Sequence, residues 1–254
     1  MKNLKNFFKN EKIEFFAVLP ADTAQIINPV REHEIAGFES VVVFLIPYKT
    51  NVASERNVAR FAAASDYHMY AAQLFERFRM LYPDCCCYCD NSPINEKKLA
   101  AEAGLGIIGE NSLIINEKYG SYIFLGEIFL KQRFESYSPV CKPKKCSSCG
   151  SCKVTCPVGL DFSCCISLIN QKKRITAEEE DVIRASRFKW GCDLCQDVCP
   201  YNIKAANTPI DFFKTDILDT LTVSDIDRMV SDSSFKNRAY AWRGEKVIKR
   251  NLEL

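Results

Sequence analysis

The sequence predicts an α+β domain, in which strands and helices alternate much as in an α/β fold, followed by a smaller cysteine-rich domain. In the first half of the 254 residues, short apolar stretches of strand length alternate with helical patterns. Nine of the 14 cysteines fall between Cys146 and Pro200. The composition, with 47% hydrophobic and 26% charged residues, excludes disordered, collagen-like and coiled-coil chains.

The strands expected in the first domain are short and apolar. Residues 13–19 and 40–46 each run into a proline and predict buried strands. Residues 113–115 and 122–130 predict two further strands, joined by a turn at Tyr119-Gly120-Ser121.

Three helices are expected from periodicity and from capping residues. Residues 66–81 predict a helix because their apolar side chains recur on or near one face. Asn95 is a good N-cap for a helix that runs to Ala103, with Gly104 directly after it. The last helix is expected over residues 235–250, and its basic residues are Lys236, Arg238, Arg243, Lys246, Lys249 and Arg250.

The sequence predicts neither a membrane helix nor a signal peptide. The longest apolar run, residues 41–46, is far shorter than the roughly 20 residues that a membrane helix needs. The first residues contain no sustained apolar core and no small-residue cleavage site. We therefore expect a cytoplasmic protein that does not associate with membranes.

The cysteines predict iron–sulfur clusters. Fourteen thiols beside two histidines, in a reduced compartment, indicate metal ligation rather than disulfide bonds. The run Cys146-x2-Cys149-x2-Cys152-x3-Cys156-Pro157 matches the bacterial ferredoxin pattern, in which the fourth cysteine binds the other [4Fe–4S] cluster. A second motif, Cys192-x2-Cys195-x3-Cys199-Pro200, follows it. A structural zinc site is the alternative, but it would leave several of these thiols unused.

Exchange of the fourth ligands between the two motifs gives two sets. The first cluster is expected on Cys146, Cys149, Cys152 and Cys199. The second is expected on Cys156, Cys192, Cys195 and either Cys164 or Cys165, of which we select Cys165 because it leads an apolar stretch. Two clusters, each with a charge of about −2, would outweigh the net charge of +2, so nucleic-acid binding would need a local basic patch.

Several longer motifs resemble one known family. They are residues 100–111 (AAEAGLGIIGEN), residues 119–128 (YGSYIFLGEI), residues 191–200 (GCDLCQDVCP) and Asp66-Tyr67-His68. Their sequences and their order are similar to those of the epoxyqueuosine reductases, which are cobalamin-dependent iron–sulfur enzymes. The resemblance extends from about residue 40 to residue 250.

The resemblance implies an activity and its cofactors. The family reduces epoxyqueuosine, at the wobble position of tRNA, to queuosine. Electrons from an external low-potential donor pass through two [4Fe–4S] clusters to cobalamin. The strand and helix pattern limits the first domain to residues 1–135, and the resemblance makes it the cobalamin domain. Residues 136–210 are expected to form the ferredoxin-like domain. Residues 211–254 are expected to form a C-terminal helical segment that packs on the body, and we expect a monomer.

The resemblance also implies the roles of individual residues. The resemblance implies that Asp90 is the proton donor. The alternative interpretation is an aspartate that caps a turn. Cobalamin contacts fall on Gly109, Asn116 and Glu127, and more loosely on Asp66, Tyr67 and His68. Contacts with tRNA fall on Asn95, Glu96 and Lys97.

The sequence departs from the family pattern at three places. It ends at Leu254, which suggests a short form without the C-terminal helical-repeat domain of longer members. Ser65 and Glu110 stand where the family has basic residues. Cys85, Cys86, Cys87 and Cys89 precede Asp90, either as a reactive thiol group or as a strand that fills core space, and we favour the strand. A related corrinoid reductase for another substrate and a ferredoxin-like electron-transfer protein therefore remain as alternatives.

Overall fold

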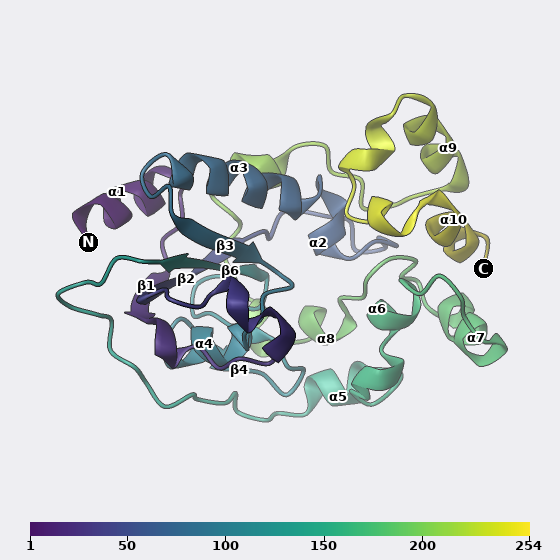
Figure 1. Cartoon of the computed structure of the whole chain (residues 1–254). Coiled ribbons are helices and arrows are strands. Elements are labelled where there is room, and N and C mark those ends of the chain that lie inside the picture. The colour runs from purple at the N-terminus through teal and green to yellow at the C-terminus, as the bar shows by residue number, and fades with distance from the viewer. The chain divides into compact units, whose positions relative to one another are not determined.

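The computed structural model describes residues 1–254 and divides them into two compact units (Figure 1). Unit 1 comprises Met1–Tyr48, Tyr70–Cys149 and Lys204–Ile210. Unit 2 comprises Lys49–Met69, Gly150–Ile203 and Asp211–Leu254. The units interleave along the chain, and the expected limits of the functional domains stay a prediction.

Unit 1 is built on a four-stranded antiparallel sheet with the strand order β1-β2-β6-β3. Its strands are β1 (Phe16–Pro20), β2 (Ser40–Pro47), β6 (Ile123–Leu130) and β3 (Cys85–Cys89). A separate ladder joins β4 (Ile107–Ile108) to β5 (Ile114–Ile115). The strands predicted over residues 40–46 and 122–130 are confirmed, and β2 is buried along its whole length.

The first predicted strand is shorter than expected. The preceding helix α1 (Lys2–Asn10) ends in a turn in which Lys12 has a φ of 58° and the Ile13 amide donates to the Phe8 carbonyl. These residues terminate the helix, so β1 begins only at Phe16. Helix α1 was not predicted from the sequence, although Leu4, Phe7 and Phe8 lie on one buried face of it.

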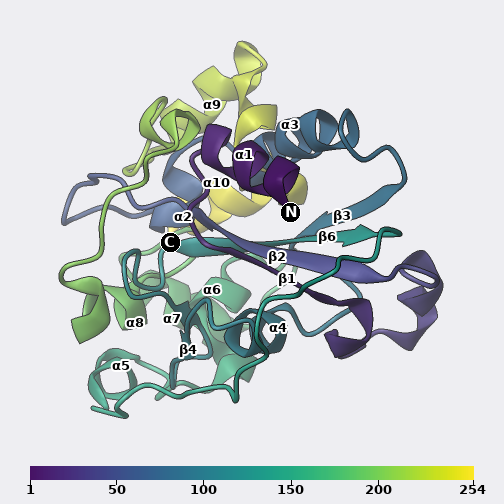
Figure 2. The same cartoon turned by 90° about the vertical axis from the view of Figure 1, so that its left-hand side faces the viewer.

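Helices cover both faces of the sheet (Figure 2). On one face lie α1 and α3 (Tyr67–Arg79), with the Phe8 ring 4.6 Å from Phe16 and the Phe7 ring 5.0 Å from Phe78. On the other face lies α4 (Glu96–Glu102), whose Leu99 and Ala100 pack with apolar side chains of β2 and β6. The α4 start is as predicted, because the Asn95 side chain accepts a hydrogen bond from the Lys98 amide at 3.1 Å.

The four cysteines before Asp90 form the edge strand β3, as favoured from the sequence. Cys85, Cys86 and Cys87 are half-buried and Cys89 is buried. The Sγ atoms of Cys85 and Cys87 lie 3.4 Å apart on one face of the strand.

Unit 2 consists of short helices around a core that contains Trp190, Tyr240, Ile226 and Ile248. Its helices are α2 (Arg60–Ala63), α5 (Ser151–Thr155), α6 (Ile166–Ile169), α7 (Ala177–Ala185), α8 (Leu194–Asp197), α9 (Val223–Ser231) and α10 (Glu245–Glu253). None of the helices in the chain combines the length and the apolar character needed to cross a bilayer.

The basic helix predicted over residues 235–250 is wrong. Ser234–Asn237 and Ala241–Arg243 are short 3-10 turns, and α10 begins only after Gly244, which has a φ of 85°. Arg238 between them is extended and buried, and its guanidinium donates to the carbonyl of Asp216 at 2.6 Å. The helix is therefore interrupted at Arg238, whose side chain is buried in unit 2. Residues 235–250 form no continuous basic face as a result.

Candidate active site

Asp90 lies on a strained, exposed turn at the end of β3. Asp90 and Asn91 have φ values of 64° and 52°, which is the left-handed region. Such a conformation costs on the order of 1 kcal/mol per residue and persists where the surroundings hold it. The Asn91 amide donates to Asp90 Oδ1 at 2.9 Å, and Arg31 donates to the Asn91 carbonyl at 2.6 Å. The turn therefore presents the Asp90 carboxylate at the surface.

Glu127 is a buried acid at the middle of β6. Its side chain is fully buried, and neither carboxylate oxygen makes a hydrogen bond. Tyr88 lies opposite it in the sheet, but the Tyr88 hydroxyl donates to Glu34 at 2.6 Å instead. Burial raises the pKa of Glu127 well above its ordinary value, and the charges of Glu96 and Asp90 raise it further. Glu127 therefore favours its protonated form.

Glu96 in the first turn of α4 completes a group of three carboxyl side chains. Burial raises the pKa of Glu96 to about 7, and the charge of Asp90 acts in the same direction, while Lys97 opposes both. A carboxyl group with a pKa near neutrality can both take up and release a proton at physiological pH. The structure thus brings Asp90, Glu96 and Glu127 together from a loop, a helix and a strand.

The loop between α4 and β6 holds the other two predicted cobalamin contacts. The Asn116 amide nitrogen donates to the Leu105 carbonyl at 2.8 Å, and its oxygen accepts from the amides of Lys118 and Tyr119. A Cβ atom on Gly109 would lie 2.4 Å from Asn111 Oδ1 and 3.1 Å from Ile115 Cδ1. The packing of the loop itself accounts for both residues. Glu127 differs from Gly109 and Asn116 because its buried carboxylate oxygens have no hydrogen-bond partner. The amide groups of a corrin could supply one.

Asp66, Tyr67 and His68 belong to unit 2, at the start of α3. Asp66 Oδ1 accepts a hydrogen bond from the His68 amide and lies 2.9 Å from His68 Nδ1. The Tyr67 ring stacks on the His68 ring with centroids 4.1 Å apart. These contacts are local to the helix start, and the proximity of the motif to cobalamin stays a prediction.

The second predicted cluster set lies wholly within unit 2. Burial raises the pKa of Cys192 to about 12, and the neighbouring thiols of Cys165 and Cys195 contribute. The Cys164 thiol lies instead 3.7 Å from the Asp161 carbonyl. The charge of Cys156 also acts on the Cys164 thiol, so the choice of Cys165 over Cys164 as the fourth ligand stays a prediction. In the first set, Cys146 and Cys149 belong to unit 1 and Cys152 and Cys199 to unit 2, so that set stays a prediction.

The cysteine motifs offer sulfur donors alone, which is the donor set of [4Fe–4S] clusters. All 14 cysteines are free thiols. No three His, Cys, Asp or Glu side chains converge as one metal ion would require. In a [4Fe–4S] cluster each thiolate binds a different iron atom, so the four sulfur atoms need no such convergence.

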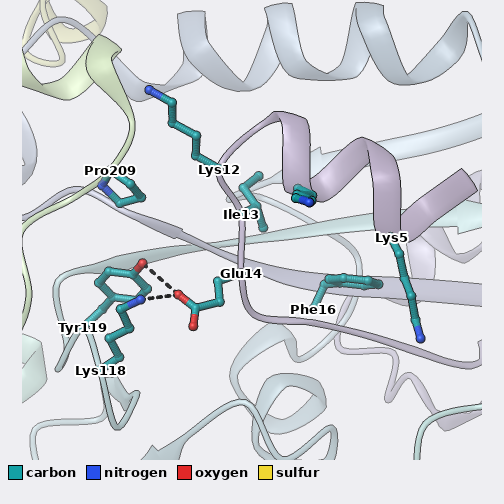
Figure 3. Close-up of a pocket in the computed structure, with 9 residues that line it drawn as sticks. Lys5, Lys12, Ile13, Glu14, Phe16, Lys118, Tyr119 and Pro209 are labelled. Carbon is teal, nitrogen blue, oxygen red and sulfur yellow. Dashed lines mark hydrogen bonds and ion pairs between the residues drawn. The ribbon is translucent and has the colours of Figure 1, made fainter. Parts of the chain in front are cut away.

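A lysine-rich cavity of about 360 Å3 lies on unit 1, between α1, the start of β1 and the turn before β6 (Figure 3). Its charged lining residues are Lys5, Lys9, Lys12, Glu14 and Lys118. Glu14 pairs with Lys118 and accepts a hydrogen bond from the Tyr119 hydroxyl at 3.3 Å. The charged side chains give the cavity a net positive charge. The spacing of Lys5 and Lys9 on α1, away from the buried face of that helix, is a sequence signal that could have indicated this cavity.

Known proteins resemble this chain along most of its length. An epoxyqueuosine reductase from Gloeobacter violaceus is 30% identical over 240 residues, which cover 85% of this chain and 73% of the relative. Another from Leadbetterella byssophila is 30% identical over 237 residues, 86% of this chain and 77% of the relative. No family model matches the chain. The chain belongs to the epoxyqueuosine reductase family.

Solved structures of epoxyqueuosine reductases share the fold. The Streptococcus thermophilus enzyme superposes with a TM-score of 0.78 at 20% identity and covers 99% of this chain and 79% of its own. A complex with an epoxyqueuosine-modified tRNA stem loop gives 0.77 at 21% identity with the same coverage. The Bacillus subtilis enzyme, with an aspartate-bearing catalytic loop swung out of its active site, gives 0.72 at 20% identity. The mixed α/β fold expected from the sequence is thereby confirmed, and members of the epoxyqueuosine reductase family are oxidoreductases.

Proposed function

We propose that this protein reduces epoxyqueuosine in tRNA to queuosine. The observation that carries the proposal is the strained turn of Asp90 beside the buried Glu127, in a chain that belongs to the epoxyqueuosine reductase family. The relatives named above carry this activity in their names, and one solved structure contains a modified tRNA stem loop.

The chemistry needs an acid beside the epoxide. Removal of the epoxide oxygen forms a carbon–carbon double bond, consumes two electrons, and releases the oxygen as water. Because an alkoxide or hydroxide is a poor leaving group, the oxygen must be protonated as its bonds to carbon break. Asp90 serves as that proton donor, because its turn places the carboxyl group at the surface where a nucleoside can reach it.

The remaining residues hold the cofactors. Cys146, Cys149, Cys152 and Cys199 bind one [4Fe–4S] cluster, and Cys156, Cys165, Cys192 and Cys195 bind the other. Glu127, with its unpaired oxygens, contacts the corrin. When bound, the clusters and cobalamin supply the electrons of the reduction, which originate from an external low-potential donor.

Binding of tRNA uses local positive charge. Asn95, Glu96 and Lys97 at the start of α4 contact the anticodon arm. The lysines of the cavity on α1 provide cations for backbone phosphates, a role that the predicted C-terminal basic helix cannot fill.

The test is anaerobic reconstitution followed by nucleoside analysis. The protein is loaded with clusters and cobalamin, reduced, and incubated with tRNA that contains epoxyqueuosine. Mass spectrometry of the digested tRNA then measures the loss of one oxygen. We expect conversion by the wild type and by Asp84→Asn, an exposed aspartate at the other end of β3, and none by Asp90→Asn.

Two results would contradict the proposal. Turnover by Asp90→Asn close to that of the wild type would remove Asp90 as the donor. No conversion by a wild-type protein that demonstrably holds both clusters and cobalamin would favour a related reductase for another substrate, an alternative motivated by Ser65 and Glu110. A protein that binds no corrinoid would instead be an electron-transfer module.

A further inference from the structure

The proposed reduction leaves one proton unassigned. Conversion of an epoxide into an alkene and water breaks two carbon–oxygen bonds, and the oxygen takes up two protons with the two electrons. A single carboxylic acid at Asp90 carries only one of these protons. The second must come from another group or through it from solvent.

Glu127 and Glu96 are placed to supply it. Cys89, the residue before Asp90, pairs with Gly126 in the sheet, so the Asp90 turn leaves β3 next to Glu127. Glu96 begins the helix that packs on the same face of β6. Glu127, Glu96 and Asp90 thus form a row of three carboxyl side chains. Glu127 is fully buried, Glu96 is half-buried and Asp90 is exposed.

The surroundings keep this row short of positive charge. The groups whose charges act on Glu127 are Glu96 and Asp90, and both are acidic. Strand β2 contributes only uncharged side chains beside it, and the Tyr88 hydroxyl from β3 is bonded to Glu34. Lys97 is the cation whose charge acts on Glu96, and the Arg31 guanidinium lies at the exposed end, where it donates to the Asn91 carbonyl beside Asp90. Burial and the neighbouring acidic charges raise the pKa of both Glu127 and Glu96, so this buried pair retains protons at neutral pH.

We propose that Glu127 stores a proton, and that Glu96 transfers it to Asp90 after Asp90 has protonated the departing oxygen. Asp90 then delivers the second proton, water leaves, and the row is refilled from solvent through the exposed end. In this proton transfer Glu96 and Glu127 act through Asp90, in addition to the corrin and tRNA contacts proposed for them above. The inference rests on the proposed function, since it concerns the same reduction.

The kinetic test uses Glu96→Gln in the fully loaded enzyme. The matched control is Glu102→Gln, at the far end of α4, where the carboxylate pairs with Lys98 at 3.7 Å. We expect Glu96→Gln to lower kcat, measured at saturating tRNA because Glu96 also belongs to the segment proposed to contact the anticodon arm, at least about tenfold. A small diffusible acid such as imidazolium should restore part of this loss, whereas it should not alter the wild type or Glu102→Gln.

A second readout is independent of turnover. The carbonyl stretch of a protonated carboxyl group shifts between H2O and D2O in the infrared spectrum. We expect the protein at pH 7 to show such a band, Glu127→Gln to weaken it and Glu102→Gln to keep it at full intensity. Should Glu127→Gln fail to fold, the half-buried Glu96 still permits the kinetic test.

The outcomes separate the two proposals. A wild type that makes no alkene product overturns the proposed function and the relay together. Product formation with Glu96→Gln kinetics equal to those of Glu102→Gln, or a spectrum without a protonated carboxyl band, overturns the relay alone.

Discussion

The buried Glu127 should make the stability of the protein depend on pH in a way that one substitution removes. Glutamine has nearly the shape of a protonated glutamate but cannot ionise, so Glu127→Gln mimics the form that burial favours. In the unfolded chain the glutamate has a pKa of about 4.3. In the folded protein the pKa of Glu127 is raised well above its ordinary value by burial and by the charges of Glu96 and Asp90.

The sign follows from the two pKa values. The folded state binds the proton more tightly, so its advantage is fully present below the unfolded pKa and is lost as the pH rises toward the folded pKa. Each pH unit between the two values lowers the free energy of unfolding by about 1.4 kcal/mol. For a chain of this size that corresponds to roughly 3–6 °C in melting temperature per pH unit.

The assay is a series of melting curves between pH 5 and pH 8. We expect the melting temperatures of Glu127→Gln and the wild type to be closest at pH 5. The variant should then become progressively more stable than the wild type as the pH rises. Glu102→Gln, whose carboxylate pairs with Lys98, should follow the wild type. Parallel curves for Glu127→Gln and the wild type would show that Glu127 is ionised in the folded protein, and the reasoning would be refuted.

Three further predictions concern the clusters, the core of unit 2 and the lysine cavity. Cys165→Ser should lose roughly half of the bound iron, measured by iron content and electron paramagnetic resonance, whereas equal losses in Cys164→Ser would contradict the ligand choice. Arg56→Ala should destabilise the protein by about 3–5 kcal/mol in thermal unfolding, because buried Arg56 pairs with the fully buried Asp193 at 2.9 Å. A loss no larger than that of Arg184→Ala, in an exposed ion pair, would count against this expectation. The double variant Lys5→Ala and Lys9→Ala should weaken tRNA binding and reduce the slope of log affinity against log salt by about 1.4–1.8. An unchanged slope would place the phosphates elsewhere.

The features that the sequence predicted well are those set by near neighbours in the chain. Asn95 caps α4 because its side chain reaches an amide three residues later, and Gly104 follows the helix with a φ of 73°. Strand β2 is apolar from Val41 onward because both of its faces are covered, and an uninterrupted apolar run predicts that. The cysteine spacing indicates clusters because the ligands of one loop are only two or three residues apart.

The features that the sequence left open depend on contacts between distant segments. The residues next to Glu127 in the chain do not show that it is buried without a hydrogen-bond partner, nor that Asp90 and Glu96 lie beside it. Strands β3 and β6 and the helix α4 come together only when the chain folds. The basic C-terminal stretch predicted one helix, yet Arg238 is buried, donates to the carbonyls of Ala63 and Asp216, and has an extended backbone that interrupts the helix. Local propensity and spacing therefore determined the caps, the central strands and the cluster motifs. Burial and long-range electrostatics, which exist only once the chain has folded, decided which acids hold protons and which cations remain available to a ligand.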